Sequence, residues 1–352
     1  MAVLSVAATQ VVQELARYDS IVDARSEDEF ALDHLPGAVN WPTLHNEERQ
    51  LIGTMYKERG GFEAKKHGAA LAAHNIGRHI THAVLGLPRD WKPLLYCWRG
   101  GKRSGALALV LDQIGFRVSL IEGGYKAFRA AMLVDLDRLA SQFDFRVVCG
   151  TTGSGKTRLL HALARRGAQV LDLEALASHR SSVLGALPGQ AQPSQKGFDS
   201  LVWNALRQLD ADRPVYVESE SRKVGNVAIA PSLMEAIRVG ACLQLVLEDP
   251  QRVELLLEEY PNFRDDPVAF CERLDVLTEL RSKAVVEQWK RMVREGAIES
   301  VVQDLLVTHY DPTYLQSMRR NFPGFARATL LQALDRSAKS MDQLAGTLLD
   351  SP

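Results

Sequence analysis

The segment "YCWRGGKRSG" (residues 96–105) places one cysteine ahead of two glycines and three basic side chains. It follows the apolar run "PLLYC" (93–97) and leads into "SGALALVLDQIG", whose apolar spacing predicts a helix that ends at Gly115. The amides and the dipole at the start of such a helix lower the pKa of a thiol in the preceding loop. We therefore interpret Cys97 as a thiolate that attacks or carries an electrophilic group.

The rest of this loop is suited to binding an anion. Gly100 and Gly101 allow successive amides to turn inward. The loop residues that we assign to the anion site are Trp98, Arg99, Gly100, Gly101, Lys102 and Ser104, together with Cys97 and Arg103. The alternative is a buried structural cysteine ahead of a basic surface turn.

A second anion-binding loop follows at "GTTGSGKT" (150–157), which satisfies G-x-x-x-x-G-K-[ST] between a predicted strand and a predicted helix. Its amides can cradle a diphosphate, Lys156 can balance phosphate charge, and Thr157 can ligate magnesium. ATP is the default ligand, and another diphosphate ester is compatible. The predicted diphosphate-binding residues are Gly150, Thr151, Thr152, Gly153, Ser154, Gly155, Lys156 and Thr157.

Four further residues are candidates for magnesium-side or phosphate contacts. Asp172 and Glu218 each follow an apolar run, and Glu218 is favoured because "VYVESE" approaches it as a full strand. Both acids fit ordinary strand ends as well. Arg222 and Lys223 lie close enough in sequence to Glu218 to reach a phosphate. We expect no dedicated cluster of metal ligands.

The chain of 352 residues is too long for one ordinary domain. Alternating strands and helices predict a parallel α/β domain over 1–135 and a second, P-loop α/β domain over 136–250. After Pro250, long amphipathic patterns predict a helical C-terminal region over 251–352. The expected strands are 20–25, 93–97, one within 117–128, one before the glycine loop, one between the following helix and Asp172, 214–220 and 242–249. The stretch 178–199 is expected to be a surface loop.

Charge and cysteine usage restrict the class of protein. The chain has 42 basic and 43 acidic residues, so a strongly basic nucleic-acid binder is not what the total shows, although a local basic face is compatible. Four sparse cysteines without zinc-ligand spacing predict a reducing compartment. No apolar run approaches the roughly 20 residues that span a bilayer. We expect a cytoplasmic protein with no membrane association.

Residues 15–130 resemble the rhodanese family through "DAR", "EFALDHLPGAVN", the Cys97 loop and "LIEGGYKAF". The resemblance implies that Cys97 is the catalytic position, which carries sulfur as a persulfide in that family, and that Arg103 closes the loop. The spacing is C-x5-R where simple sulfurtransferases have C-x4-R. One extra residue widens the cradle, as in the rhodanese-like cell-cycle phosphatases, and favours a phosphate-sized ligand. Asp23, Arg25 and His34 also match family positions, and for these we favour strand-end pairing and a satisfied turn histidine.

The fusion of this domain to the P-loop domain resembles one family over nearly the whole chain, tRNA 2-selenouridine synthase. The most specific segments are "VLDLEALASHRSSVLGALPGQAQPSQ" and "VYVESESRKVGN". The resemblance implies replacement of sulfur by selenium in wobble 2-thiouridine, with selenophosphate as the donor and a geranylated 2-thiouridine made from geranyl diphosphate as the intermediate. It implies no tightly bound cofactor beyond Mg²⁺ or a nucleotide at the P-loop, and tRNA as the partner.

The candidate tRNA contacts are Lys283, Lys290 and Arg294, which helical spacing places on one side with Trp289 beside them. A charged solvent face with salt bridges explains the same pattern. A second basic patch, Lys57, Arg59, Lys65, Lys66 and His67, can meet phosphates or be ordinary surface. Two alternative functions stay open: a P-loop kinase or ATPase with a regulatory rhodanese module, and a C-x5-R phosphatase.

Overall fold

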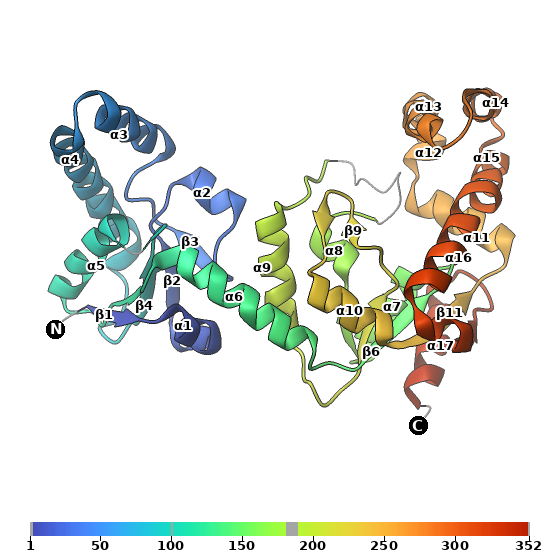
Figure 1. Cartoon of the computed structure of the whole chain (residues 1–352), viewed down its shortest axis with the longest axis horizontal. Helices are drawn as coiled ribbons and strands as arrows, with labels where there is room; N and C mark the ends of the chain where they lie inside the picture. The colour runs from blue at the N-terminus through green and yellow to red at the C-terminus, as the bar shows by residue number, and fades with distance from the viewer. Residues whose placement is uncertain (1–2, 100, 181–188, 351–352) are drawn as a thin grey trace. The chain divides into compact units, whose positions relative to one another are not determined.

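The computed structural model describes residues 3–99, 101–180 and 189–350. The chain forms two compact units (Figure 1). The first comprises Met1–Arg138 together with Pro193–Asn204, and the second comprises Leu139–Gln192 together with Ala205–Pro352. The chain therefore passes between the two units three times.

The first unit contains a five-stranded parallel sheet with the order β1-β5-β4-β2-β3. Its strands are β1 (Leu4–Val6), β2 (Ser20–Asp23), β3 (Ala38–Asn40), β4 (Pro93–Tyr96) and β5 (Ser119–Ile121). All four residues of β4 are buried, which explains its uninterrupted apolar sequence because both faces of a central parallel strand are covered. Cys97, the next residue, is also buried, and Trp98 is the first residue after β4 that is not.

Helices cover this sheet. They are α1 (Ala8–Glu14), η1 (Leu15–Arg17), α2 (Glu27–Leu32), α3 (Asn46–Glu58), α4 (Gly61–His79), η2 (Ile80–Val84), α5 (Lys102–Ile114), α6 (Gly124–Ala140) and α9 (Gln195–Leu206). Helix α5 ends as predicted at Gly115, whose φ of +114° suits glycine at a helix C-terminus. Helices α3 and α4 form a hairpin inserted between β3 and β4 (Figure 1), and Gly68 of α4 packs against the Ile52 side chain of α3.

Helix α9 lies with the first unit, although the sequence boundaries place its residues in the P-loop domain and partly in the surface loop 178–199. Its Trp203 is fully buried, packs edge-to-face on Phe128 and donates its indole N–H to Asp135 at 2.9 Å. Arg129 of α6 bonds Asp199 at 2.6 Å. The contacts of Trp203 and Asp199 thus attach α9 to α6, and not to the helices and strands that adjoin α9 in the sequence.

The second unit contains another five-stranded parallel sheet, ordered β12-β11-β6-β8-β7. Its strands are β6 (Phe145–Cys149), β7 (Gln169–Leu171), β8 (Val215–Glu218), β11 (Ala241–Val246) and β12 (Thr329–Gln332), and β9 (Lys223–Val224) pairs separately with β10 (Val227–Ala228). Strand β12 departs from the helical expectation for 251–352. Four residues are too few to show an alternating pattern, and β12 is defined by its pairing with β11.

The remaining helices belong to the second unit. They are α7 (Lys156–Arg165), α8 (Leu173–Ala177), α10 (Pro231–Val239), α11 (Asp249–Glu259), α12 (Asn262–Asp265), α13 (Pro267–Leu274), η3 (Asp275–Glu279), α14 (Lys283–Arg294), α15 (Ile298–Leu305), η4 (Leu306–Tyr310), α16 (Asp311–Asn321), η5 (Pro323–Arg327) and α17 (Ala338–Asp350). Leu159 and Leu163 of α7 share a core with Met341 of α17. Within the described ranges, no helix is both long and apolar enough to cross a bilayer.

Replacing Trp203 with alanine tests the assignment of α9. We expect Trp203→Ala to destabilise the first unit by about 3–5 kcal/mol, because it leaves a cavity and removes the bond to Asp135. Hydrogen exchange should accelerate in 124–138 and 195–204, whereas β6 and β8 keep their protection. Faster exchange confined to the second unit would contradict the assignment.

Candidate active site

Cys97 stands directly after β4 and is 4% exposed. The Gly101 amide donates to its Sγ at 3.5 Å. The start of α6 holds the loop from the other side, since the Tyr125 amide donates to the Cys97 carbonyl at 2.8 Å and the Lys126 amide donates to the Trp98 carbonyl at 3.1 Å. Gly100 lies outside the described residues.

The surroundings of Cys97 favour its thiolate. Burial alone raises the pKa of Cys97, but hydrogen bonds from Gly101 and Ser104 and the charge of Arg103 outweigh it, so the pKa is lowered. The Ser104 side chain is fully buried, and its hydroxyl has no hydrogen-bond partner of normal geometry among the described residues. It is still one of the groups that lower the pKa of the Cys97 thiol.

Arg103 is engaged by a carboxylate that the sequence analysis did not identify. Its guanidinium donates to both oxygens of Glu29, at 2.6 and 3.2 Å. Burial raises the pKa of Glu29, but the hydrogen bonds and charge of Arg103 outweigh this effect, so the pKa is lowered and Glu29 is ionised. The positive charge of Arg103 is thus largely balanced, and the buried part of the anion site depends on loop amides. The acidic helix start "SEDEF" was the only signal for Glu29.

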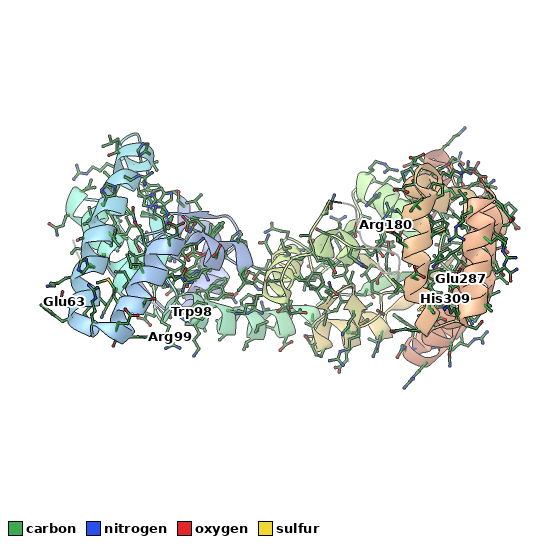
Figure 2. All side chains as sticks on the ribbon, turned by 90° about the horizontal axis from the view of Figure 1, so that it is seen from above. Glu63, Trp98, Arg99, Arg180, Glu287 and His309 are labelled. Atoms are coloured by element: carbon green, nitrogen blue, oxygen red, sulfur yellow. The ribbon has the colours of Figure 1, made fainter. Side chains whose placement is uncertain are left out.

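The rim of the loop carries further cations. Arg99 and Lys102 are exposed. Trp98, labelled with Arg99 in Figure 2, stacks on Tyr125 with ring centroids 5.4 Å apart. The Lys196 ammonium of α9 lies 5.7 Å from the centre of the Trp98 ring. Sequence reasoning missed Lys196 because it follows Trp98 by almost a hundred residues.

The other rhodanese-like positions have structural partners. Asp23 and Arg25 form a buried ion pair of 2.6 Å, and the guanidinium of Arg25 lies 4.0 Å from the centre of the Tyr125 ring. His34 bonds the Phe30 carbonyl at 2.9 Å and stacks on the Phe30 ring. These contacts fit the favoured interpretation of strand-end pairing and a satisfied turn histidine.

The P-loop has the predicted context, with strand β6 before it and helix α7 after it. A Cβ at Gly150 would lie 2.7 Å from the Leu245 carbonyl, so only glycine fits. Lys156 donates to the Gly150 carbonyl at 2.9 Å, and Thr157 donates to Glu218 at 2.7 Å. The loop thus presents Lys156 and Thr157 together at its open side.

Residues from the C-terminal region hold this loop in place. The buried Arg252 donates from Nε and Nη2 to the Thr152 carbonyl, at 3.0 and 2.8 Å, and pairs with Asp311 at 2.6 Å. The Gly150 amide donates to the Tyr314 hydroxyl at 2.7 Å. Neither Arg252 nor Tyr314 lies in a local motif, so neither residue could be identified from the sequence alone.

Glu218, not Asp172, is the acid beside Thr157. Asp172 instead caps α8, accepting from the Ala175 amide at 2.8 Å. Burial raises the pKa of Glu218, and Lys156 and Thr157 oppose this effect only in part.

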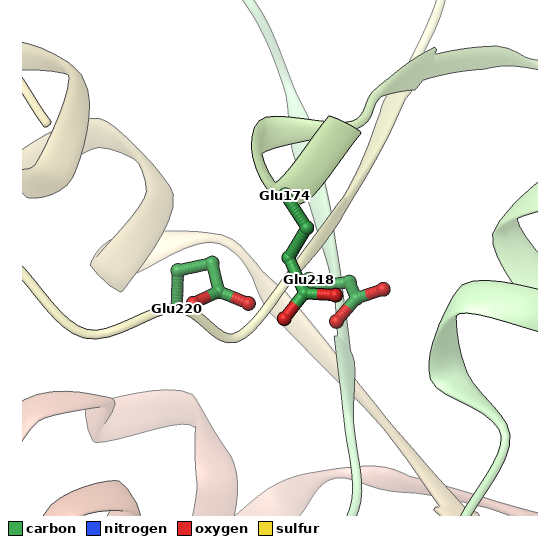
Figure 3. A group of neighbouring side chains, drawn as sticks. All are labelled: Glu174, Glu218 and Glu220. Atoms are coloured by element: carbon green, nitrogen blue, oxygen red, sulfur yellow. The ribbon is translucent and has the colours of Figure 1, made fainter. Parts of the chain in front are cut away.

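Two other carboxylates stand beside Glu218. Oxygens of Glu174, Glu218 and Glu220 lie within 4.8 Å of one another (Figure 3). With Thr157, these oxygen ligands are the type that Mg²⁺ prefers. Arg222 and Lys223 have exposed side chains and do not line the cavity described next.

A cavity of about 330 Å³ opens from Lys156 and Thr157. Its far part is largely apolar and lies among α11, α15 and α16, lined by Leu256, Tyr260, Phe263, Val302, Leu306 and Met318. Arg180 also lines it, bonding the Glu259 carbonyl at 2.9 Å. The open side of the P-loop and an apolar pocket are therefore continuous.

The three candidate tRNA contacts on α14, Lys283, Lys290 and Arg294, have different surroundings in the structure. Lys290 is 9% exposed and its ammonium bonds Asp275 and Glu287. Trp289 belongs to the core of this region. Lys283 and Arg294 are exposed. Lys290 is therefore paired with two acids, which fits the alternative of a charged face with salt bridges, and its contact with tRNA stays a prediction.

A Ser104→Ala variant tests how the thiolate is stabilised. Loss of the buried hydroxyl removes a hydrogen bond to the charged form, so the Cys97 pKa should rise. The measurement is the alkylation rate by iodoacetamide against pH, with Cys97→Ser as the background from the three other cysteines. An unshifted profile would contradict the role of Ser104.

Comparison with known proteins covers both units. A rhodanese-like domain model matches residues 7–131, and a model described as the tRNA 2-selenouridine synthase AAA domain matches residues 143–267. A protein named tRNA 2-selenouridine synthase from Nitrosomonas europaea is 33% identical, with 81% of this chain and 76% of that protein covered. One of the same name from Sulfurovum sp. is 30% identical, with 86% and 89% covered. The chain belongs to the tRNA 2-selenouridine synthase family.

Proposed function

We propose that the enzyme replaces the sulfur of wobble 2-thiouridine in tRNA with selenium, using geranyl diphosphate to activate the sulfur and selenophosphate as the selenium donor. Membership of the family supports tRNA as the substrate and selenouridine as the product. The observation that carries the finer proposal is the continuity of the P-loop with an apolar cavity. Since the substrate is tRNA, we place the enzyme in the cytoplasm.

The cavity favours a prenyl diphosphate over a nucleotide. Its volume of about 330 Å³ suits a small ligand, and its far walls offer aliphatic and aromatic side chains. Each buried CH₂ of a prenyl tail contributes about 0.8 kcal/mol to binding. Leu256, Val302 and Leu306 suit a prenyl tail, which needs no hydrogen-bond partner, although Ser219, Thr313 and Ser317 also line the cavity. This favours the prenyl donor over the kinase or ATPase alternative.

The first step then uses the P-loop as a leaving-group site. The sulfur of 2-thiouridine attacks C1 of geranyl diphosphate, so an S–C bond forms, a C–O bond breaks and the N3 proton is released. The departing diphosphate is stabilised by the loop amides and Lys156. Mg²⁺ bound by Thr157 and Glu218 would supply further positive charge there. The product carries sulfur as a thioether, which leaves C2 more readily than the original sulfur.

The second step assigns Cys97 a specific atom to attack. Selenium in selenophosphate is already at the selenide level, so a bond between Sγ and selenium would need an oxidant. Attack of the Cys97 thiolate on phosphorus needs none: an S–P bond forms, the P–Se bond breaks and hydrogen selenide ion leaves. That ion then attacks C2, a C–Se bond forms and geranylthiolate departs. Water hydrolyses the phosphocysteine to phosphate, which restores Cys97. The wide C-x5-R loop and the lowered pKa of Cys97 support this step.

The phosphocysteine can be trapped. Acid quenching after incubation with selenophosphate should leave phosphate on the peptide that contains Cys97. Cys97→Ser should abolish it, whereas Lys156→Ala should retain it because the P-loop serves the other step. Selenium on Cys97 without phosphate would overturn this assignment.

Filling the cavity should block geranylation. Val302 is buried and lines the cavity, whereas Val307 is 50% exposed and does not. We expect Val302→Trp to lower geranylated 2-thiouridine at least tenfold and Val307→Trp to leave it unchanged. Mass spectrometry of nucleosides, with each donor omitted in turn, gives the readout. If tRNA incubated with the wild-type enzyme and both donors gains neither a geranyl group nor selenium, the proposed function is refuted.

A further inference from the structure

The hairpin of α3 and α4 has an outer end, the hairpin tip (residues 56–67), that the mechanism above does not use. Of residues 51–70, only Met55 and Ala64 are buried. The tip is therefore stabilised mainly by the contact of the two helices with each other. Glu63 of the tip is labelled in Figure 2.

Two aromatic side chains of the tip face solvent. Tyr56 is 60% exposed and Phe62 is 73% exposed. The Tyr56 ring lies against Gly61, where an added Cβ would be 3.1 Å from Cε2, and the Lys66 ammonium lies 5.3 Å from the centre of the Phe62 ring. The tip thus presents ring surface on both sides of the turn between the helices.

The same tip concentrates positive charge. Lys57, Arg59 and Lys65 are exposed, and none of them forms an ion pair within the described part of the chain. Lys66 pairs with Glu63 at 2.8 Å. Exposed cations interleaved with aromatic rings are what single-stranded and looped RNA requires, since the cations meet phosphates and the rings stack on bases.

We propose that the hairpin tip binds the tRNA substrate, with Lys57, Arg59 and Lys65 on backbone phosphates and Phe62 stacked on an unpaired base. The inference rests on the proposed function.

The placement of α3 supports this surface. Near its start, Arg49 lies 3.7 Å from Glu29, the partner of Arg103 in the Cys97 loop. Arg59 follows Arg49 by ten residues, so the tip is about 15 Å further along the helix. If the reacting base of a tRNA stem-loop enters the Cys97 loop, the backbone next to that base is long enough to reach the hairpin tip.

Removal of the charges tests the proposal through the salt dependence of binding. The test variant is Lys57→Gln/Arg59→Gln/Lys65→Gln. Its matched control, Arg89→Gln/Lys92→Gln/Arg117→Gln, removes three exposed cations before β4 and β5, at the sheet end opposite Cys97. Binding of unmodified tRNA is measured by filter retention between 50 and 200 mM salt. In the test variant the slope of log K against log salt should fall by about 2 to 3, because each phosphate contact contributes roughly 0.7–0.9. The control should keep the wild-type slope.

Phe62→Ser separates stacking from charge. It should weaken tRNA binding about tenfold with the salt slope unchanged, since base stacking is worth roughly 1–3 kcal/mol. Unaltered Cys97 alkylation profiles show that the variants keep the fold of the first unit.

Three outcomes would overturn the proposal. In the first, wild type and test variant bind tRNA alike, or the control weakens binding as much as the test variant. In the second, the variants lose affinity for vesicles of anionic lipid instead of tRNA, which would make the tip a membrane contact. In the third, wild type fails to bind tRNA at all, which would defeat the proposed function as well.

Discussion

The buried guanidinium of Arg252 joins the P-loop to the C-terminal helices. It donates from Nε and Nη2 to the Thr152 carbonyl along one edge and from Nη1 and Nη2 to the Asp311 carboxylate along another edge. A buried charge of this kind is tolerated only when its hydrogen bonds are complete. The loop and the start of α16 must therefore take up their positions together. Because α16 also supplies Tyr314 and Met318, the wall of the apolar cavity forms only when the phosphate loop is in place.

The P-loop and the Cys97 loop differ in whether the charge of their basic side chain is balanced by an acid. In the P-loop, Lys156 bonds a backbone carbonyl and no acidic side chain among the described residues forms an ion pair with it. In the Cys97 loop, Arg103 is held by ionised Glu29, and the pKa of the Cys97 thiol is lowered. A fully charged arginine beside a thiolate would hold the sulfur in an ion pair. Sharing Arg103 with Glu29 weakens that pairing while amides and Ser104 keep the pKa low.

Local sequence signals were sufficient for the loops and for most strands. Both loops follow strands whose burial is visible as uninterrupted apolar runs, and glycine spacing defines the phosphate cradle. The failures involve contacts between distant residues. Nothing near Trp203 indicates that its ring packs on Phe128, and nothing near Arg252 indicates Thr152, a hundred residues earlier. The pairing of Lys290 on α14 was missed for a related reason. Helical periodicity places Lys290 next to Trp289 in the chain, but it does not show that Trp289 is in the core or that Asp275 binds the Lys290 ammonium.

The path of the chain links the two units through an inserted segment. Segment Pro193–Asn204 leaves the second unit, builds α9 into the first and returns to become β8. Strand β8 ends at Glu218, the acid beside Thr157, while α9 brings Lys196 over Trp98 beside Cys97. A fusion of two independent domains would need only one connection. Here the first unit is complete only with Pro193–Asn204, a segment that interrupts the sequence of the second unit.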